Sequence, residues 1–424
     1  MLFQTPEFLV FFFLVVIAVA LAHGATARKC VLLGASWIFY GWSSPRFLIP
    51  LLITTFADYA IGLALEKRRS RALVAISVAG NLTLLALLRI EPGILHMAVP
   101  LGISFYTFHS ISYIVDVYRG QLRACRSPLD YALFIAFFPE LVAGPIVRGT
   151  QFLPQLERSP IVRIDEFAVF RVTRGLAKKV LIADNVAPFV NAVFADPARW
   201  PSVVIWLATI AFAVQIYCDF SGYTDIAVGL AHVFGFELPV NFDRPYFARS
   251  PSDFWRRWHI SLSSWLRDYL YIPLGGRAHR VRNVMITMLL GGLWHGLSWN
   301  FVLWGAMHGV LLIVGRRLNN IVITQLLILF TWIAFRVREP HAMLTAMRKF
   351  VLFDFDFALA GRGLLTIFFF STIALIAVFV TLHASRFDLA RLRTPALIAV
   401  CIGIGMAFFF LWPAEQTPFI YFQF

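Results

Sequence analysis

The chain has 424 residues, of which 59% are hydrophobic and only 14% are charged, and its mean hydropathy is +0.75. Apolar residues normally make up about half of a soluble globular chain, so this composition excludes a soluble protein and predicts a membrane protein. The net charge of +14 lies in short loops between apolar runs, where it sets topology and meets anionic lipid headgroups. We therefore expect membrane lipids, and no nucleic acid, as partners.

Five apolar runs in the first 126 residues are each a candidate membrane span, at 8–22, 31–42, 47–65, 72–88 and about 97–117. The first run begins after an acidic residue, so we expect a retained span instead of a cleaved signal peptide. Basic loops at 28–29, 67–71 and 119–126 come after alternate runs. Positive charge accumulates on the cytoplasmic side, which places the N-terminus outside.

The spacing of apolar runs becomes irregular after residue 126. The run 131–138 is too short to cross a bilayer, and Pro139, Gly144 and Pro145 interrupt the chain directly after it. Such a pattern predicts a re-entrant or buried segment, because protein must cover the freed backbone groups. Residues 164–195 place basic side chains among apolar ones at helical spacing, which is typical of an amphipathic helix lying at the membrane interface.

A polar stretch, 218–225, comes directly after the sixth apolar run at 203–217 and precedes another run at 226–236. It contains Asp219, Ser221, Tyr223 and Asp225. One interpretation is a polar loop at a helix end, with Asp219 or Ser221 as the N-cap. The other is a functional site, because acids close to the hydrocarbon are costly.

Residues 250–271 predict a second interfacial helix, rich in tryptophan on one face and arginine on the other. Ser250 or Ser252 is the expected N-cap, and Pro251 suits the first turn. His259 falls at the edge of the apolar face. Periodicity alone predicts that His259 is an interfacial polar residue.

His295 stands inside the stretch 280–309, with apolar residues around it for most of a bilayer's thickness. An imidazole at membrane depth costs a few kcal/mol and is a functional hypothesis by default; the alternative is a packed histidine in a helical bundle. Ser298-Trp299-Asn300 breaks the span, and His308 comes later in the same stretch. Glycines beside His295 leave room for a substrate or another helix, at Gly291, Gly292 and Gly296.

Later apolar runs at 321–335, 364–382 and 396–411 bring the total to roughly ten to twelve membrane segments. We expect an all-α polytopic protein with re-entrant and interfacial helices. It would form one integral domain over 1–424, with N-terminal spans (1–126), a core (127–316) and C-terminal spans (317–424). The four cysteines, Cys30, Cys125, Cys218 and Cys401, show no metal or disulfide spacing, and we predict no metal site.

Several long motifs resemble the membrane-bound O-acyltransferase family, in particular its bacterial branch that includes alginate O-acetyltransferase. They are GPIVR at 144–148, YCDFSGYTDIAVGLAHVFGFELPVNFDRPY at 217–246, SPSDFWRRWHISLSSWLRDYLYIPLGG at 250–276 and LGGLWHG at 290–296. The resemblance implies a multi-helix membrane enzyme around a central funnel or tunnel. It implies that His295 is catalytic and that His259 is a second functional position. The residues expected to line the substrate site are Trp294, Asn300, Asp219 and Tyr223.

Acyl transfer to an alcohol requires a base for the hydroxyl proton and a donor for the oxyanion. We expect His295 to act as the base; the alternative is that it carries the acetyl group as an acyl-imidazole. His259, Asn300 or a backbone N–H near Gly296 would contact the oxyanion. The resemblance implies acetyl-CoA as the donor with no bound cofactor, an extracytoplasmic acetyltransferase as the partner, a polysaccharide as the final acceptor, and a multi-pass protein of the bacterial inner membrane.

Three alternatives remain open from the sequence. The same fold would serve D-alanyl transfer to teichoic acid, although an acidic element to hold the amino group is not evident. Acetyl transfer to peptidoglycan is the second. The third is a transporter of polysaccharide precursors. The sequence shows no internal repeat, which weakens this alternative because many transporters are built from duplicated halves.

Overall fold

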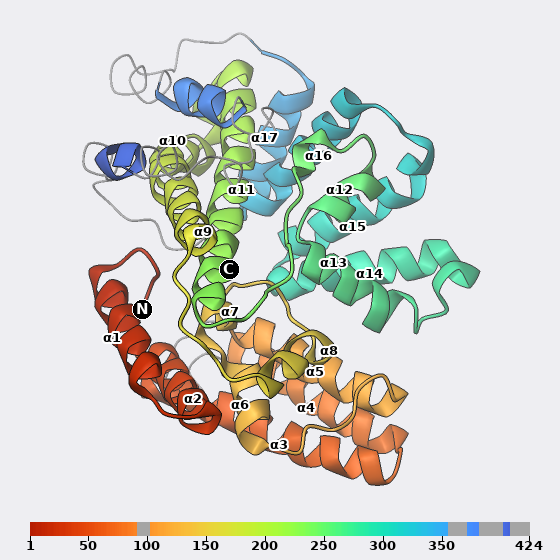
Figure 1. Ribbon diagram of the computed structural model, residues 1–424. Helices are drawn as coiled ribbons and strands as arrows, with labels where there is room; N and C mark the ends of the chain where they lie inside the picture. Colours follow the sequence, from red (N-terminus) through yellow and green to blue (C-terminus); the bar gives the residue numbers. More distant parts are fainter. Residues whose placement is uncertain (91–101, 355–370, 381–401, 408–424) are drawn as a thin grey trace. The chain divides into compact units, whose positions relative to one another are not determined.

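The computed structural model describes residues 1–90, 102–354, 371–380 and 402–407 (Figure 1). Every regular element in these ranges is a helix, which confirms the predicted all-α class. The chain forms two compact units: one comprises Met1–Val172 and Tyr223–Val240, and the other comprises Thr173–Gly222 and Asn241–Phe424. These boundaries differ from the predicted ones at 126 and 316, and the division into one integral domain stays a prediction.

The first unit begins with five helices that match the five predicted apolar runs and continues with three short ones. They are α1 (Pro6–Leu21), α2 (Ala25–Gly41), α3 (Leu48–Lys67), α4 (Arg71–Ile90), α5 (Ile103–Arg119), α6 (Pro128–Ala136), α7 (Phe138–Leu141) and α8 (Gly149–Phe152). The start of the fifth predicted run, 97–101, lies outside the described residues.

The second unit contains the remaining helices, and α9 (Glu166–Leu176) and α11 (Ser202–Val233) each contribute to both units. The others are α10 (Asp184–Ala195), α12 (Pro251–Arg257), α13 (Ile260–Leu266), α14 (Arg280–His295), α15 (Trp299–Val314), α16 (Ile321–Arg336) and α17 (Pro340–Val351). Two π-helical segments, Ala177–Ala183 and Arg267–Tyr271, extend α9 and α13. The 3₁₀ turns are Pro45–Phe47, Leu153–Glu157, Pro197–Arg199, Pro245–Phe247, Gly276–His279 and Gly315–Arg317.

Three helices of the described chain are long and apolar enough to cross a membrane: Pro45–Lys67, Arg71–Ile90 and Ser202–Val233. Shorter apolar helices occur at Pro6–Leu21, Ile321–Arg336 and Ser371–Val380. The predicted number of ten to twelve membrane segments stays a prediction. The predicted aromatic C-terminal anchor lies outside the described residues.

A buried carboxylate joins two of the membrane-length helices. Asp58 of α3 accepts hydrogen bonds from the Ser77 hydroxyl at 2.5 Å and from the Asn81 amide at 2.8 Å, both on α4. A carboxylate at membrane depth requires such partners, because an unsatisfied one costs several kcal/mol. The three side chains therefore fix how α3 and α4 pack.

The short helices α6 and α7 are buried, as predicted for the run that is too short to cross. Ser127 caps α6 by accepting from the Asp130 N–H at 3.1 Å. Within the first unit, the Phe137 ring contacts Phe236 at 4.9 Å and the Phe138 ring contacts Phe39 at 5.7 Å. These rings anchor a segment that has too few residues to span a bilayer by itself.

The polar stretch 218–225 is helical, so its interpretation as a loop with an Asp219 or Ser221 N-cap is wrong. It lies inside the unbroken helix α11. A helix tolerates this stretch in part because the buried Asp219 carboxylate is paired with Lys179 at 2.9 Å. Local composition alone resembled a loop, whereas tertiary pairing keeps the backbone helical.

The predicted helix over 250–271 is interrupted at its centre. Ser250 caps α12 as predicted, by accepting from the Asp253 N–H at 3.1 Å, and Pro251 occupies the first turn. The chain then turns at His259, whose φ of 43° lies in the left-handed region, and α13 starts from there. His259 is fully buried, so its interpretation as an interfacial residue is wrong.

Helices α14 and α15 form a closely packed pair joined by a short turn (Figure 1). A Cβ atom on Gly292 would clash with the Phe301 carbonyl oxygen, and one on Gly305 would clash with the Met288 carbonyl oxygen. The room beside His295 that the glycines predict is thus taken, at Gly292, by the neighbouring helix. This pairing fixes the end of α14, where His295 stands.

Candidate active site

His295 is the last residue of α14 and is 4% exposed. Aromatic rings surround its imidazole within the second unit, with centroid separations of 4.9 Å to Trp294, 5.1 Å to Trp304 and 5.2 Å to Phe335. Such a wall excludes water and strengthens any electrostatic interaction inside it. That the imidazole also faces a passage for reactants stays a prediction.

His259 is held in its unusual backbone conformation by Asn241. The Asn241 carbonyl oxygen accepts from the Ile260 N–H at 2.9 Å, and its side-chain Oδ1 accepts from both the N–H and the hydroxyl of Ser261, at 3.2 and 2.9 Å. A non-glycine residue in the left-handed region costs of order 1–3 kcal/mol, and such strain clusters at functional sites. Asn241 is therefore the clamp of the turn.

The hydrogen bond of His259 Nδ1 defines which ring nitrogen can donate. Nδ1 accepts from the Leu262 N–H at 3.3 Å, so the neutral ring carries its proton on Nε2. His259 is then a hydrogen-bond donor through Nε2 and not a base through that atom. The same ring contacts Trp294 at 5.9 Å, so Trp294 touches both His259 and His295.

His308 lies nearby but both of its ring nitrogens have internal partners. Nδ1 accepts from the Trp255 indole N–H at 3.2 Å, and Nε2 lies 3.0 Å from the Thr331 hydroxyl, which itself donates to the Ile328 carbonyl oxygen at 2.7 Å. Because Nδ1 and the Thr331 hydroxyl hydrogen are both used in this way, Nε2–H of His308 is the donor to the Thr331 oxygen. His308 ties α12, α15 and α16 together and supports Trp304, 4.7 Å away.

Asn300 is fully buried at the start of α15, and its amide nitrogen donates to the Ala334 carbonyl oxygen of α16 at 3.1 Å. This bond fixes the backbone next to Phe335, whose ring covers His295. One of the two N–H groups that an oxyanion would use is thus engaged. The expected contact of Asn300 with substrate stays a prediction.

Asp219 belongs to a buried charge cluster. Lys179 Nζ lies 2.8 Å from Asp184 and 2.9 Å from Asp219, and all three side chains are at most 4% exposed. Phe220, the next residue on α11, contacts the His259 ring at 4.6 Å. Lys179 comes from the stretch 164–195 that was predicted to lie at the membrane interface, but its ammonium is buried and paired inside the protein.

Tyr223 belongs to the first unit, where its ring stacks on Phe3 at 4.5 Å. The structure thus groups His295, His259, Trp294 and Asn300 in the second unit and places Asp219 on the helix that supports His259. The substrate-binding roles predicted for Trp294, Asp219 and Tyr223 stay predictions. In the described part of the chain, no three His, Cys, Asp or Glu side chains are grouped as metal ligands.

Sequence reasoning missed four contributors to this site: Asn241, Trp304, Phe335 and Lys179. Asn241 sits in a segment without regular structure, and its role depends on a turn that periodicity did not predict. Trp304 and Phe335 come from two helices whose pairing is tertiary. For Lys179 the available signal was its position among apolar residues, which equally fits an interfacial helix.

Comparisons with known proteins identify the family of this chain. A model of the membrane-bound O-acyltransferase family matches residues 121–325, a span that includes His259 and His295. A probable alginate O-acetylase of Azotobacter vinelandii is 36% identical over 91% of this chain and 85% of its own length. A peptidoglycan O-acetyltransferase of Helicobacter pylori is 32% identical over 83% and 80%, respectively.

A more distant relative, a teichoic acid D-alanyltransferase of Streptococcus thermophilus, is 27% identical over 54% of this chain and 60% of its own length. The matches to the two O-acetyltransferases extend over most of this chain and most of each relative, as the motif resemblance predicts. The chain belongs to the membrane-bound O-acyltransferase family and is an O-acyltransferase of the membrane.

Proposed function

We propose that this enzyme moves an acetyl group from cytoplasmic acetyl-CoA across the bacterial inner membrane for O-acetylation of an extracytoplasmic polysaccharide. The observation that carries the proposal is the aromatic-walled His295, which shares Trp294 with a donor histidine, His259. An extracytoplasmic acetyltransferase would receive the group and modify the polymer, in line with the alginate O-acetylase relatives.

His295 would act as the general base. Its ring takes the proton of the acceptor hydroxyl as that oxygen attacks the acetyl carbonyl carbon, and the resulting imidazolium returns the proton to the departing CoA sulfur. Acyl transfer is then balanced, with one ester formed and one thioester broken. The aromatic wall supports this role, because water excluded from the ring cannot hydrolyse the thioester.

His259 would stabilise the oxyanion. Its Nδ1 accepts from the Leu262 N–H, so Nε2–H is the donor that a developing negative charge requires. His308 is the weaker candidate for chemistry, since its two nitrogens hold Trp255 and Thr331. The two buried histidines thus divide into one that supports structure and one that is arranged to donate.

Radiolabelled acetyl transfer from acetyl-CoA, measured with the purified full chain in lipid, tests the proposal. His295→Ala should lower the rate by roughly 10²–10⁴-fold, the usual contribution of a general base. His341→Ala is the matched control, because His341 is exposed on α17, and it should transfer at the wild-type rate. Wild-type transfer by the folded His295→Ala protein would contradict the role of His295.

The alternative role of His295, as an acetyl carrier, predicts a different intermediate. Rapid quenching during turnover, combined with peptide mapping, would then find acetyl-imidazole at His295. The base mechanism predicts no label on that peptide while product accumulates.

The acceptor alternatives are separated by donor and product. Acetyl-CoA turnover with no transfer of D-alanine from a carrier protein is expected, because the O-acetyltransferase relatives cover far more of this chain than the D-alanyl relative does. Recovery of the acetyl label in peptidoglycan, in place of an exported polysaccharide, would favour peptidoglycan as the acceptor.

A further inference from the structure

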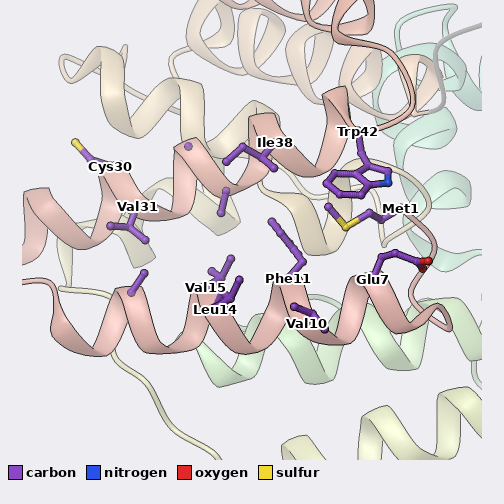
Figure 2. Close-up of a pocket in the computed structure, with 13 residues that line it drawn as sticks. Met1, Glu7, Val10, Phe11, Leu14, Val15, Cys30, Val31, Ile38 and Trp42 are labelled. Carbon is purple, nitrogen blue, oxygen red and sulfur yellow. The ribbon is translucent and has the colours of Figure 1, made fainter.

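An apolar groove of about 680 Å³ runs between α1 and α2 in the first unit (Figure 2). The two helices are antiparallel, so Glu7 and Trp42 lie at one end and Ala18 and Cys30 at the other. The remaining lining is almost wholly aliphatic or aromatic, from Met1, Val10, Phe11, Leu14, Val15, Val31, Gly34, Ala35 and Ile38.

Several of these side chains are largely exposed among the described residues. Val10 is 62% exposed, Leu14 is 59% and Ile38 is 58%. In water such a contiguous apolar surface would drive association. In a bilayer the same surface contacts acyl chains at no cost.

Gly34 keeps the floor of the groove free of side-chain atoms. It stands in the middle of α2, where glycine costs roughly 0.5–1 kcal/mol relative to alanine. A Cβ atom there would meet no atom within 4 Å among the described residues. Gly292 of α14, by contrast, is filled by the Phe301 backbone of the neighbouring helix. The space over Gly34 is therefore open among the described residues.

The dimensions of the groove fit an acyl chain. Cys30 and Trp42 are twelve residues apart, so the lining extends about 18 Å at 1.5 Å per residue. One leaflet supplies about half of a hydrocarbon core of about 30 Å.

We infer that the groove between α1 and α2 binds one acyl chain of a phospholipid, with the headgroup at the end formed by Glu7 and Trp42. Trp42 is 56% exposed at the end of α2, where an indole ring suits the boundary between hydrocarbon and headgroups. Glu7, the one acidic group in the lining, stands at the same end. The bound chain would pass over Gly34 toward Cys30.

The test uses the full chain in nanodiscs that contain phosphatidylethanolamine with a diazirine in its acyl chain. After photolysis, peptide mapping should place adducts on residues 10–15 and 31–38. Gly34→Leu puts a side chain into the groove and should lower those adducts by about tenfold or more, the effect of losing about 1.4 kcal/mol of binding. Gly80→Leu is the matched control, because Gly80 of α4 also has open space over its Cβ but lies outside the groove.

A second measurement is thermal stability in detergent. Added phospholipid should raise the Tm of the wild type and of Gly80→Leu, whereas Gly34→Leu, already filled, should gain less. The inference is overturned by equal labelling of the groove in Gly34→Leu and the wild type. It is also overturned by a wild-type map without adducts on either helix, a result that decides the matter even where Gly34→Leu fails to fold.

Discussion

In the described part of the second unit, three histidines are buried, and the surroundings of their rings differ. We propose different roles for them on this basis. His308 uses both nitrogens to hold Trp255 and Thr331, whereas His259 accepts through Nδ1 from its own helix turn. His295 ends a helix inside an aromatic wall. The sequence placed His295 and His259 through their motifs, but only the contacts separate a donor from a structural histidine.

Substitution of His259 distinguishes a donor from a base. In His259→Gln the amide nitrogen replaces the Nε2–H donor, so part of the activity should remain. His259→Leu removes the donor and should lower kcat by roughly 10²–10³-fold, as loss of an oxyanion contact does. Acetyl transfer under single-turnover conditions measures both. Equal loss in the two variants would contradict the donor role.

Glu140 is a buried acidic residue that is expected to lower the stability of the protein. It is fully buried in α7, and neither carboxylate oxygen has a hydrogen-bond partner among the described residues. Burial raises the pKa of the Glu140 carboxyl well above its ordinary value, so folding must either protonate this group or bury its charge, and both cost free energy. Glu140→Gln keeps the shape without that charge, so the Tm of the purified protein should rise by a few degrees.

Glu140→Ala serves as the comparison, because it removes the charge but leaves a cavity and should give a lower Tm than Glu140→Gln. A Glu140→Gln protein that melts well below the wild type would show that the carboxylate has a stabilising partner.

At the scale of elements, the sequence predicted the helices with long apolar runs and the break between α14 and α15 at Ser298-Trp299-Asn300, but not the break at His259. The predicted runs 72–88 and 321–335 correspond to α4 (Arg71–Ile90) and α16 (Ile321–Arg336), because apolar length alone defines them. The turn at His259 was missed because it depends on Asn241, which lies far away in sequence. Polar content in α11 misled for the same reason: its ion-pair partner, Lys179, is tertiary.

Removing the Asn241 clamp should weaken catalysis without touching the reacting groups. Asn241→Ala loses the side-chain acceptor for Ser261, so the His259 turn should relax. We expect kcat to fall by about tenfold, the effect of a small misplacement of a catalytic group, with little change in KM.

Asn320 provides the matched control, because its side chain accepts a backbone N–H at the start of α16, away from His259. Asn320→Ala should cost about 1 kcal/mol of stability as a lost helix cap and leave kcat unchanged. The clamp is contradicted by an Asn241→Ala protein that keeps the wild-type kcat.

At the scale of the whole molecule, the second unit contains His259 and His295, and the first unit contains the membrane-length helices Pro45–Lys67 and Arg71–Ile90. Composition predicted the membrane class, and motifs predicted the family, which the comparisons confirm. The arrangement of side chains around His295 could not be predicted from the sequence, because the surrounding rings come from three different helices, α14, α15 and α16. Because the chain belongs to this family, it is an acyltransferase, and the family gives no support to the alternative that it transports polysaccharide precursors.

The central claim is that His295 supplies the proton acceptor in a site that reactants enter. Chemical rescue tests it most directly: acetyl transfer by His295→Ala is measured in lipid with increasing imidazole. The account predicts low activity that rises with imidazole concentration, because the small base fills the vacated site next to Trp304. Full activity in His295→Ala without imidazole, or an inactive folded variant that no concentration of imidazole restores, would contradict it.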